Sequence, residues 1–489
     1  EGGSVSGDSY TFIGEKVEGN SQVISYKTGG NFTMKSSFDY IPEMAKSELY
    51  LEFTAKVKNK TKSMPAVKVA DGVLATAELY SQTTTSTKPA YAEDAFQRVI
   101  KQAKQANIMF LIQQTNLRWS ELNSASMKEF TETLKEVDAD KENKVLDNIE
   151  VSAYASPDGG FDLNDRLAAQ RQSNAESHVN KLLKKNKVDA YVDTEYTAED
   201  WEGFQELVAA SNIPDKDLIL RVLSMYEDPE EREVQIRNLS AGFEELATEI
   251  LPELRRARLT VNYNLIGRSD DEIQAQYKSN AKALSVEELL YAATLTEETP
   301  EKKDIYTTTT NVYPEDYRAY NNLGAISIAE GNLEVAKNYL KQAASKKDCA
   351  EVNANRALVA LAEGNTEEAE TFVSRATSSP VYNELVGNLN EAKGNYAAAA
   401  QSLAGAKTNS AALAEILAKN YTAAAKILDE VENPDAYTYY LKAVVGARTS
   451  RVAVVSENLV KAIRLDSSLR EKALNDVEFA KFAASIANF

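Results

Sequence analysis

Apolar and polar residues alternate near the N-terminus of the chain. Within residues 48–59 the odd positions are apolar and most even positions are polar; the apolar ones are Leu49, Leu51, Phe53, Ala55 and Val57. A period of two is typical of a strand with one buried face, and the Asp71-Gly72 pair is a hairpin signal. We therefore expect residues 8–80 to form a small β-sandwich, followed by a Ser/Thr-rich linker at 81–90.

The pattern then changes repeatedly between strand and helix up to residue 265. Apolar runs predict strands at about 107–113, 147–154 and 257–265, which we expect in one sheet. Residues 92–106 predict a helix leading into this domain, and residues 163–184 a long helix beside it. Amphipathic segments at about 200–240 predict a helical insertion. The expected fold is a mixed α/β domain.

From about residue 285 the chain becomes rich in alanine and in helix-pair patterns. Short turns recur at 330–332, 363–365, 393–395 and, in degenerate form, 418–420. Alanine follows each turn at a fixed distance, at Ala336, Ala369, Ala399 and Ala424. The turns are 33, 30 and 25 residues apart, so the helices shorten along the chain. Residues 285–465 are expected to stack as repeated helix pairs, after a polar connector at 266–284.

One charged residue interrupts an apolar column of the helix at 163–184. The column consists of Leu163, Leu167, Ala175 and Val179, and Arg171 lies within it. A guanidinium at such a position must either reach water or meet an anion. Arg171 is therefore the first candidate binding residue.

Composition excludes several classes of function. The net charge of −19 argues against a nucleic-acid partner, and no apolar run approaches the roughly 18 residues of a membrane-spanning helix. His178 is the only histidine and Cys349 the only cysteine, which argues against a zinc site, a Ser-His triad and an internal disulfide. We expect no catalytic residues, no metal and no cofactor. A carboxylate pair of a cell-wall or glycan-active enzyme remains open as a disfavoured alternative.

The central region resembles the OmpA C-terminal-like domain, a periplasmic module that binds peptidoglycan. Phe110 and Leu117 fit its first strand and turn, and Arg255 with Arg256 matches the basic pair opening its last strand. The resemblance implies a ligand site at Ser156, Asp158, Asn164 and Arg171, with Arg171 in the role of the carboxylate-binding arginine. Ser156 stands where the family has aspartate, and Asp158 lies two residues later. The alternative is that Arg171 pairs with Asp158 or Asp162 and only fixes the loop.

The C-terminal region resembles tetratricopeptide repeats, whose concave side binds proteins. Gly324 and Gly387 match the small residue of the first helix, and Tyr320 matches the aromatic position before it. Side chains left for the concave face give the predicted partner-binding residues Tyr317, Tyr320, Asn321 and Tyr382, because Tyr offers a large contact area at low entropy cost. In the alternative interpretation Tyr320 and Tyr382 fill the core between repeats.

These features predict a multidomain chain. Residues 1–90 form the β-rich domain and linker, 91–265 the OmpA-like domain, 266–284 the connector and 285–489 the all-α solenoid. The resemblances imply a non-enzymatic scaffold in the periplasm of a Bacteroidetes-type cell, peripheral to the outer membrane. It would bind peptidoglycan and a protein complex, with a lipid anchor as an open question. An alternative is an accessory subunit of an outer-membrane assembly or transport complex that does not bind the wall.

Overall fold

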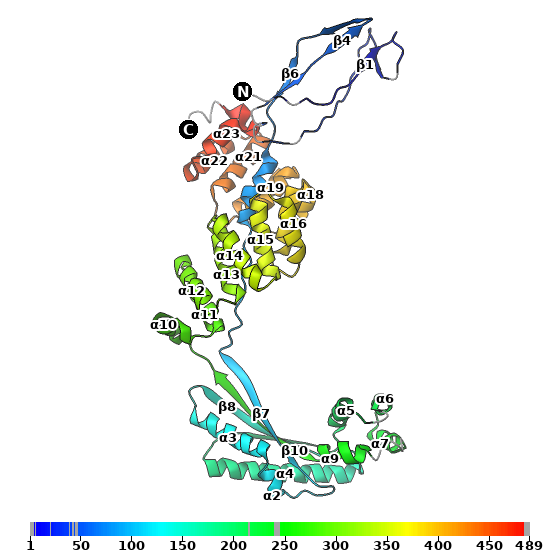
Figure 1. Cartoon of the computed structure of the whole chain (residues 1–489), viewed down its shortest axis with the longest axis vertical. Helices are drawn as coiled ribbons and strands as arrows, with labels where there is room; N and C mark the ends of the chain where they lie inside the picture. Colours follow the sequence, from blue (N-terminus) through cyan, green and yellow to red (C-terminus); the bar gives the residue numbers. More distant parts are fainter. Residues whose placement is uncertain are drawn as a thin grey trace. The chain divides into compact units, whose positions relative to one another are not determined.

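The computed structural model describes residues 4, 6–19, 21–38, 40–41, 44, 47–213, 216–238 and 245–483. The chain forms two compact units (Figure 1). One unit joins residues 1–93 to residues 296–489, and the other consists of residues 94–295. The first unit is therefore discontinuous in sequence, because the second is inserted into it.

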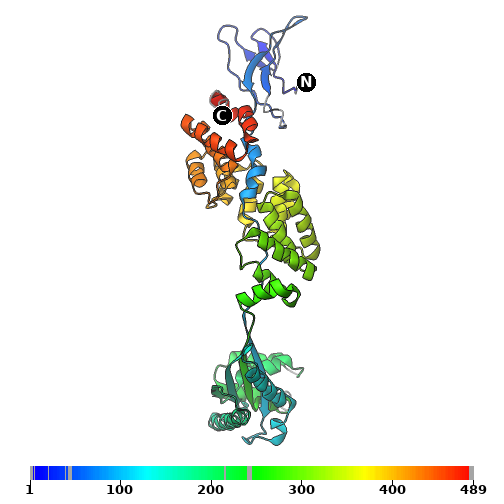
Figure 2. The same ribbon diagram turned by 90° about the vertical axis from the view of Figure 1, so that its left-hand side faces the viewer.

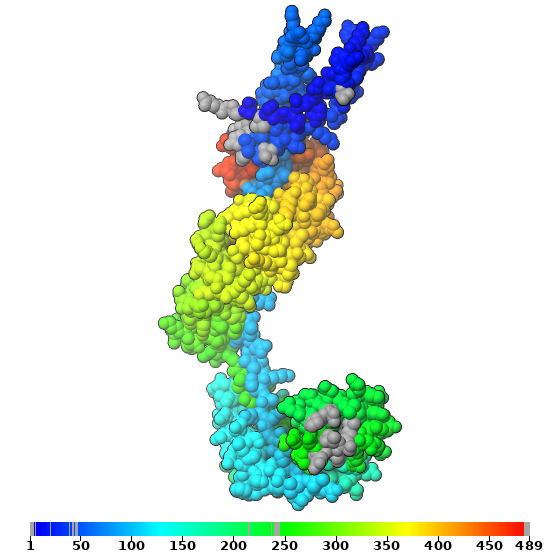
Figure 3. Space-filling view, turned by 45° about the vertical axis from the view of Figure 1, so that its right-hand side comes forward, coloured from blue at the N-terminus to red at the C-terminus, as the bar shows by residue number. Residues whose placement is uncertain are grey.

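The N-terminal strands do not form the expected sandwich. They pair two by two, as β1 (Phe12–Gly14) with β2 (Gln22–Ile24), β3 (Glu48–Leu51) with β6 (Val67–Asp71), and β4 (Thr54–Val57) with β5 (Lys60–Ser63). Leu49, Phe53, Val57 and Val69 are exposed, although they alternate as in a half-buried strand. The sandwich prediction is wrong because these described ribbons lack a second layer; Figure 3 shows them as thin blue projections.

The predicted linker at 81–90 is also wrong. Residues 76–86 form three helical turns, η2 (Thr76–Leu79), α1 (Tyr80–Thr83) and η3 (Thr84–Ser86). Hydroxyl groups that we expected to face solvent instead donate hydrogen bonds to carbonyls of the preceding turn. Ser86 Oγ, for example, donates to the Thr83 carbonyl at 2.6 Å. Leu79 and Ala90 belong to the apolar cores of the helical unit. We call residues 76–92 the strap.

The inserted unit is built on a four-stranded sheet with the order β7-β10-β8-β9. Its strands are β7 (Val99–Met109), β8 (Lys144–Tyr154), β9 (Val192–Thr197) and β10 (Arg256–Ile266). The strands predicted at 147–154 and 257–265 are confirmed, as β8 and β10 of one sheet. Of the strand predicted at 107–113, only residues 107–109 lie in β7, and residues 110–113 belong to the loop that follows. The helix predicted at 92–106 is wrong, because residues 99–109 pair with β10 along their whole length. Tertiary pairing here overrides the local pattern.

Helices cover one face of this sheet, as Figure 1 shows for α3 (Ala125–Ala139) and α4 (Phe161–Asn186). Their apolar sides pack on alternate residues of the strands. The shared core includes Phe130, Leu134, Val179, Ile108, Val151 and Leu259. A short helix, α2 (Trp119–Leu122), precedes α3.

The helical insertion lies between β9 and β10, with a core of its own. It contains α5 (Trp201–Ala210), α6 (Lys216–Met225), α7 (Pro229–Asn238), the π-helical turn η4 (Leu246–Ile250) and α9 (Leu251–Leu254). The 266–284 segment is largely helical, with α10 (Asp270–Asn280) and η5 (Ala281–Ala283), and α11 (Val286–Ala292) follows it in the same unit.

The helical unit begins with α12 (Thr299–Val312) and continues as five helix pairs. The first helices of the pairs are α13 (Tyr317–Ala329), α15 (Ala350–Ala362), α17 (Tyr382–Ala392), α19 (Asn409–Leu417) and α21 (Ala436–Arg448). The second helices are α14 (Leu333–Lys346), α16 (Thr366–Arg375), α18 (Tyr396–Ser402), α20 (Tyr421–Asp429) and α22 (Val452–Leu465). Helix α23 (Leu469–Asn475) and η6 (Val477–Phe482) end the described chain.

Each pair turns in the same way. Gly331, Gly364 and Gly394 take positive φ angles of 74°, 77° and 77°. Lys419 and Ser450 adopt the same conformation in the fourth and fifth turns, at 67° and 57°. The residue after each then donates its backbone N–H to the carbonyl five residues earlier. This common bond allows the five repeats to be aligned residue by residue. The fifth repeat was not recognised from the sequence pattern, because its turn is Ser450-Arg451 and contains no glycine or asparagine.

Candidate functional site

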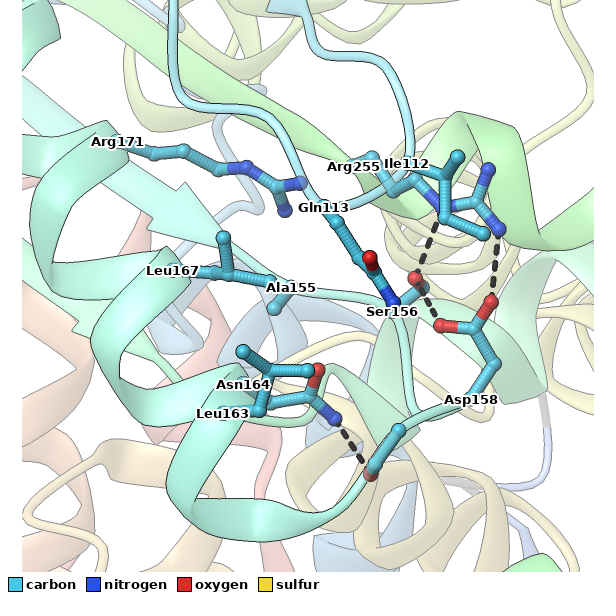
Figure 4. Close-up of a pocket in the computed structure, with 11 residues that line it drawn as sticks. Ile112, Gln113, Ala155, Ser156, Asp158, Leu163, Asn164, Leu167, Arg171 and Arg255 are labelled. Atoms are coloured by element: carbon cyan, nitrogen blue, oxygen red, sulfur yellow. Dashed lines mark hydrogen bonds and ion pairs between the residues drawn. The ribbon is translucent and has the colours of Figure 1, made fainter.

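A small surface pocket opens where β8 ends and α4 begins (Figure 4). All four predicted ligand residues line it: Ser156, Asp158, Asn164 and Arg171. The loop after β7 adds Ile112 and Gln113, and Arg255 comes from the start of the last strand. The cavity volume is about 40 Å³. That is room for roughly three water molecules or one carboxylate-sized group.

Arg171 lies at the inner side of the pocket and is only 1% exposed. Its Nε donates to the Gln114 carbonyl at 3.1 Å, its Nη1 to the Tyr154 carbonyl at 2.8 Å and its Nη2 to the Leu111 carbonyl at 3.5 Å. The guanidinium carbon also lies 5.1 Å from the centre of the Phe110 ring. Arg171 therefore ties the loop after β7 to the end of β8.

A second cation shares the pocket with a carboxylate. Arg255 Nη2 is 2.8 Å from Asp158 Oδ2, and Arg255 Nε donates to Ser156 Oγ at 3.0 Å. Ser156 Oγ in turn donates to Asp158 Oδ1 at 2.5 Å. Asn164 Nδ2 closes the loop by donating to the Gly159 carbonyl at 2.8 Å. Figure 4 shows these bonds converging on the Ser-Pro-Asp-Gly-Gly loop.

The electrostatics of the pocket favour an anion. Arg171 and Arg255 carry two positive charges against the single carboxylate of Asp158. Burial, together with the nearby charge of Arg255, lowers the pKa of Arg171 to about 10. The guanidinium thus remains charged at neutral pH but lacks the solvation it would have in water. No carboxylate of the described residues forms an ion pair with Arg171, so an external carboxylate would relieve this cost.

The alternative in which Arg171 pairs with Asp158 or Asp162 does not match these contacts. Asp158 pairs with Arg255 instead, and Arg171 holds the loops through backbone carbonyls. Arg255 is the pocket residue that sequence reasoning left out of the ligand site. The sequence signal that could have identified Arg255 as a ligand residue is its place in the basic pair Arg255-Arg256. Arg256 serves the fold, because it is buried and bonded to Asp200 at 2.8 Å.

The predicted partner-binding residues lie on the first helices of the solenoid. Tyr317 is half-buried beside the Lys347 ammonium, which lies 4.8 Å from the ring centre, and Tyr320 is also half-buried. Tyr382 packs against the apolar core of the first repeats. Asn321 is fully buried, and its Nδ2 donates to the Ala90 carbonyl at 3.0 Å. Asn321 is thus used by the strap of the same chain.

The described residues also bear on metal binding and on membrane crossing. They hold no group of three or more His, Cys, Asp or Glu residues that could bind a metal. No helix among them combines the length and apolarity needed to cross a bilayer.

Comparison with known proteins finds similarity among solved structures. A tetratricopeptide repeat protein from Parabacteroides merdae is 16% identical, with a TM-score of 0.32, over 40% of this chain and 85% of that one. The Cut9-Hcn1 hetero-tetramer of APC/C is 11% identical, with a TM-score of 0.34, over 67% and 77%. Yeast Tom70 is 12% identical, with a TM-score of 0.26, over 75% and 83%. No protein-family model and no curated protein matches the sequence.

The helix pairs themselves define the repeat class. Five consecutive pairs share one turn geometry, and small residues lie at the contact between the two helices of a pair. A Cβ at Gly324 would lie 2.8 Å from Leu340, and one at Gly387 would lie 2.4 Å from Leu403. The region from residue 317 to 465 is therefore a tetratricopeptide-like solenoid.

Proposed function

We propose that this protein is a non-enzymatic scaffold that binds peptidoglycan through the pocket at Arg171 and a protein partner through its solenoid. The setting that fits is the periplasm of a Bacteroidetes-type cell, beside the outer membrane. The observation that carries the proposal is a buried arginine, without a carboxylate partner among the described residues, in a pocket of net positive charge. Peptide stems of peptidoglycan carry free carboxylates, which a guanidinium binds well.

A second candidate function uses the same fold for protein contacts alone. It is favoured by the three backbone carbonyls that already accept from Arg171. In that case the arginine is a structural tie, and the protein is an accessory subunit of an outer-membrane complex that does not hold the wall.

Pulldown with purified sacculi separates the two candidates. If the pocket binds the wall, Arg171→Ala should weaken binding by about 1.5–3 kcal/mol, the scale of a charge-assisted hydrogen bond. Arg166→Ala is the matched control, because Arg166 lies on the same helix and is exposed. Wild-type protein that does not sediment with sacculi would remove the wall-binding proposal. A lower melting temperature with unchanged pulldown would assign Arg171 to the structural role.

Ser156→Asp tests the departure from the family pattern. The new carboxylate would face Arg255, whose Nε now donates to Ser156 Oγ. We expect it to add a partner for the ammonium group of diaminopimelate, and hence tighter binding of that amino acid in calorimetry. Unchanged or weaker binding would show that the loop does not present position 156 to the ligand.

A further inference from the structure

The strap lies along the first helices of the solenoid and is held there through its backbone. In Figure 2 it is the light-blue segment between the green-to-yellow and orange-to-red helices. Ala92 N–H donates to Asn322 Oδ1 at 2.8 Å, and Asn322 Nδ2 donates to the Ala92 carbonyl at 3.0 Å. Ala90 makes the same two bonds with Asn355, at 2.8 and 2.7 Å. Paired amide bonds of this kind recognise an extended peptide backbone whatever its side chains are.

The other half of the strap is held less completely. Asn388 Nδ2 donates to Thr87 Oγ1 at 2.9 Å, and Ser410 N–H donates to Ser86 Oγ at 3.3 Å. Several buried oxygens of this half, and of the helices α17 and α19 that pack against it, nevertheless have no hydrogen-bond partner among the described residues. They are Gln82 Oε1, Thr84 Oγ1, Glu384 Oε2, Asn388 Oδ1, Ser410 Oγ and both carboxyl oxygens of Glu391.

Alignment of the repeats by their turns shows that Glu391 is exceptional. Glu391 lies four residues before the turn asparagine, where the other repeats have apolar residues: Ile328, Leu361, Ile416 and Ala447. Asn388 lies seven residues before it, where the others also have apolar residues: Ala325, Leu358, Leu413 and Val444. The third repeat therefore carries two polar side chains at positions where the other repeats have apolar side chains. Breaks of this kind in a consistent pattern mark functional positions.

Glu391 is only 2% exposed, so its carboxyl is costly to bury. Burial raises its pKa well above the ordinary value, and the backbone N–H of Ala414, which lies near but not at hydrogen-bonding geometry, offsets this only in part. The unpaired atoms are all oxygens that can accept a hydrogen bond, and two of them, the hydroxyls of Thr84 and Ser410, can also donate. What they lack is a donor, and a cationic donor would satisfy the carboxylate best. The strap offers none there: its only basic residue, Lys88, lies near Glu384 instead.

We propose that the surface of α13, α15, α17 and α19 that the strap covers is a peptide-binding site whose resident occupant is residues 76–92. In trans it takes a peptide of a partner protein that is helical like residues 76–86 and extended after them, with small side chains and one Arg or Lys directed at Glu391. The inference deepens the proposal that the solenoid binds a protein, and it is independent of wall binding. The asparagine side chains bind the backbone of the peptide, and Glu391 favours a peptide with a positively charged side chain.

The first test turns the strap into an exchangeable ligand. Protease sites placed in the full chain at the Asp71-Gly72 turn and after Glu93 would leave residues 72–93 bound without a covalent link. Exchange for a fluorescent synthetic peptide of the same sequence is then followed by anisotropy. A lysine scan across residues 82–87 of that peptide should find one position that strengthens binding about tenfold or more, the scale of a bond to a charged group.

The matched variants assign the effect to Glu391. Glu391→Gln should abolish the gain from lysine, and Glu415→Gln should keep it, because Glu415 lies on α19 and already accepts from Asn420 at 2.8 Å. A scan without any gain, or a gain unchanged in Glu391→Gln, would overturn the proposal and leave bound water as the partner of these oxygens. Sacculus binding is measured on the other unit and would be unaffected by that failure.

A second test uses the intact chain, in case the cleaved protein does not stay folded. Backbone amides of residues 82–87 should exchange with deuterium at least tenfold faster than those of Ala90 and Ala92, since the first half of the strap must open for a partner. Excess lysine-bearing peptide should speed their exchange further. Equal protection along the strap, unchanged by peptide, would show that the strap is a permanent part of the solenoid and would contradict the proposal.

Discussion

At the scale of single residues, two buried charges are treated in opposite ways. Arg171 donates to three backbone carbonyls, so its desolvation is partly compensated. Glu391 meets no hydrogen-bond donor at bonding geometry among the described residues. An unsatisfied buried carboxyl costs more than the apolar residue that the other repeats place there. Glu391 therefore lowers stability unless a partner uses it.

Replacing Glu391 by the apolar residue of the neighbouring repeats should stabilise the protein. We expect Glu391→Leu to raise the free energy of unfolding by about 1–3 kcal/mol at neutral pH. Chemical denaturation measures it, with Glu370→Leu as the control, because Glu370 is exposed and should change stability by less than about 0.5 kcal/mol. A destabilised Glu391→Leu protein would mean that the carboxyl has a partner in the folded chain.

The same carboxyl should make stability depend on pH. Its pKa is raised in the folded state, so folding takes up a proton. The stabilising contribution is therefore complete below the ordinary value of 4.5 and is lost as pH rises through the folded pKa. Within that window the free energy of unfolding should fall by up to about 1.4 kcal/mol per pH unit, and Glu391→Gln should remove this part. Parallel pH curves for the two proteins would contradict the raised pKa.

At the scale of elements, close packing between paired helices depends on missing side chains. At Gly387 there is no room for a Cβ, because Leu403 of the facing helix occupies the space. Small residues also allow the strap to lie close to the first helices, since Ala90 and Ala92 bond to Asn355 and Asn322.

Gly387→Ala should therefore destabilise the solenoid by about 1–3 kcal/mol, the cost of overpacking. Thermal unfolding followed by circular dichroism measures the effect. Asn383→Ala on the same helix is the control, because Asn383 is exposed. Equal melting temperatures for the two variants would show that α17 and α18 can separate without cost.

At the scale of the whole molecule, the order of the chain constrains how it can be cut. The strap belongs to the solenoid, although residues 94–295 separate the two in sequence. Leu79 packs in a core with Leu413, Tyr440 and Phe479. A truncation before residue 296 therefore removes the residues that bury the strap.

Fragments should behave accordingly. Residues 94–295 have their own sheet core and should fold alone with a cooperative transition. Residues 296–489 should melt at a lower temperature alone than after addition of a peptide of residues 76–93. Coexpression and calorimetry check both expectations. A solenoid fragment that is equally stable with and without the peptide would show that the strap contributes little to folding.

The sequence by itself determined the elements whose pattern is local. Repeated Gly-Asn turns and alanines predicted the helix pairs, and apolar runs predicted β8 and β10, because turn conformation and periodic burial depend on near neighbours. The resemblance to the OmpA-like domain singled out Ser156, Asp158, Asn164 and Arg171 as ligand residues, and the structure brings all four to one pocket, while their ligand stays a prediction. Tertiary structure decided the rest. Residues 99–106 became a strand because β10 offered an edge, and most of 81–90 became buried or half-buried because asparagines far along the chain bond to Thr87 and to the backbone of Ala90. The partner of Arg255 and the isolation of Glu391 likewise depend on contacts between distant segments, which no local pattern encodes.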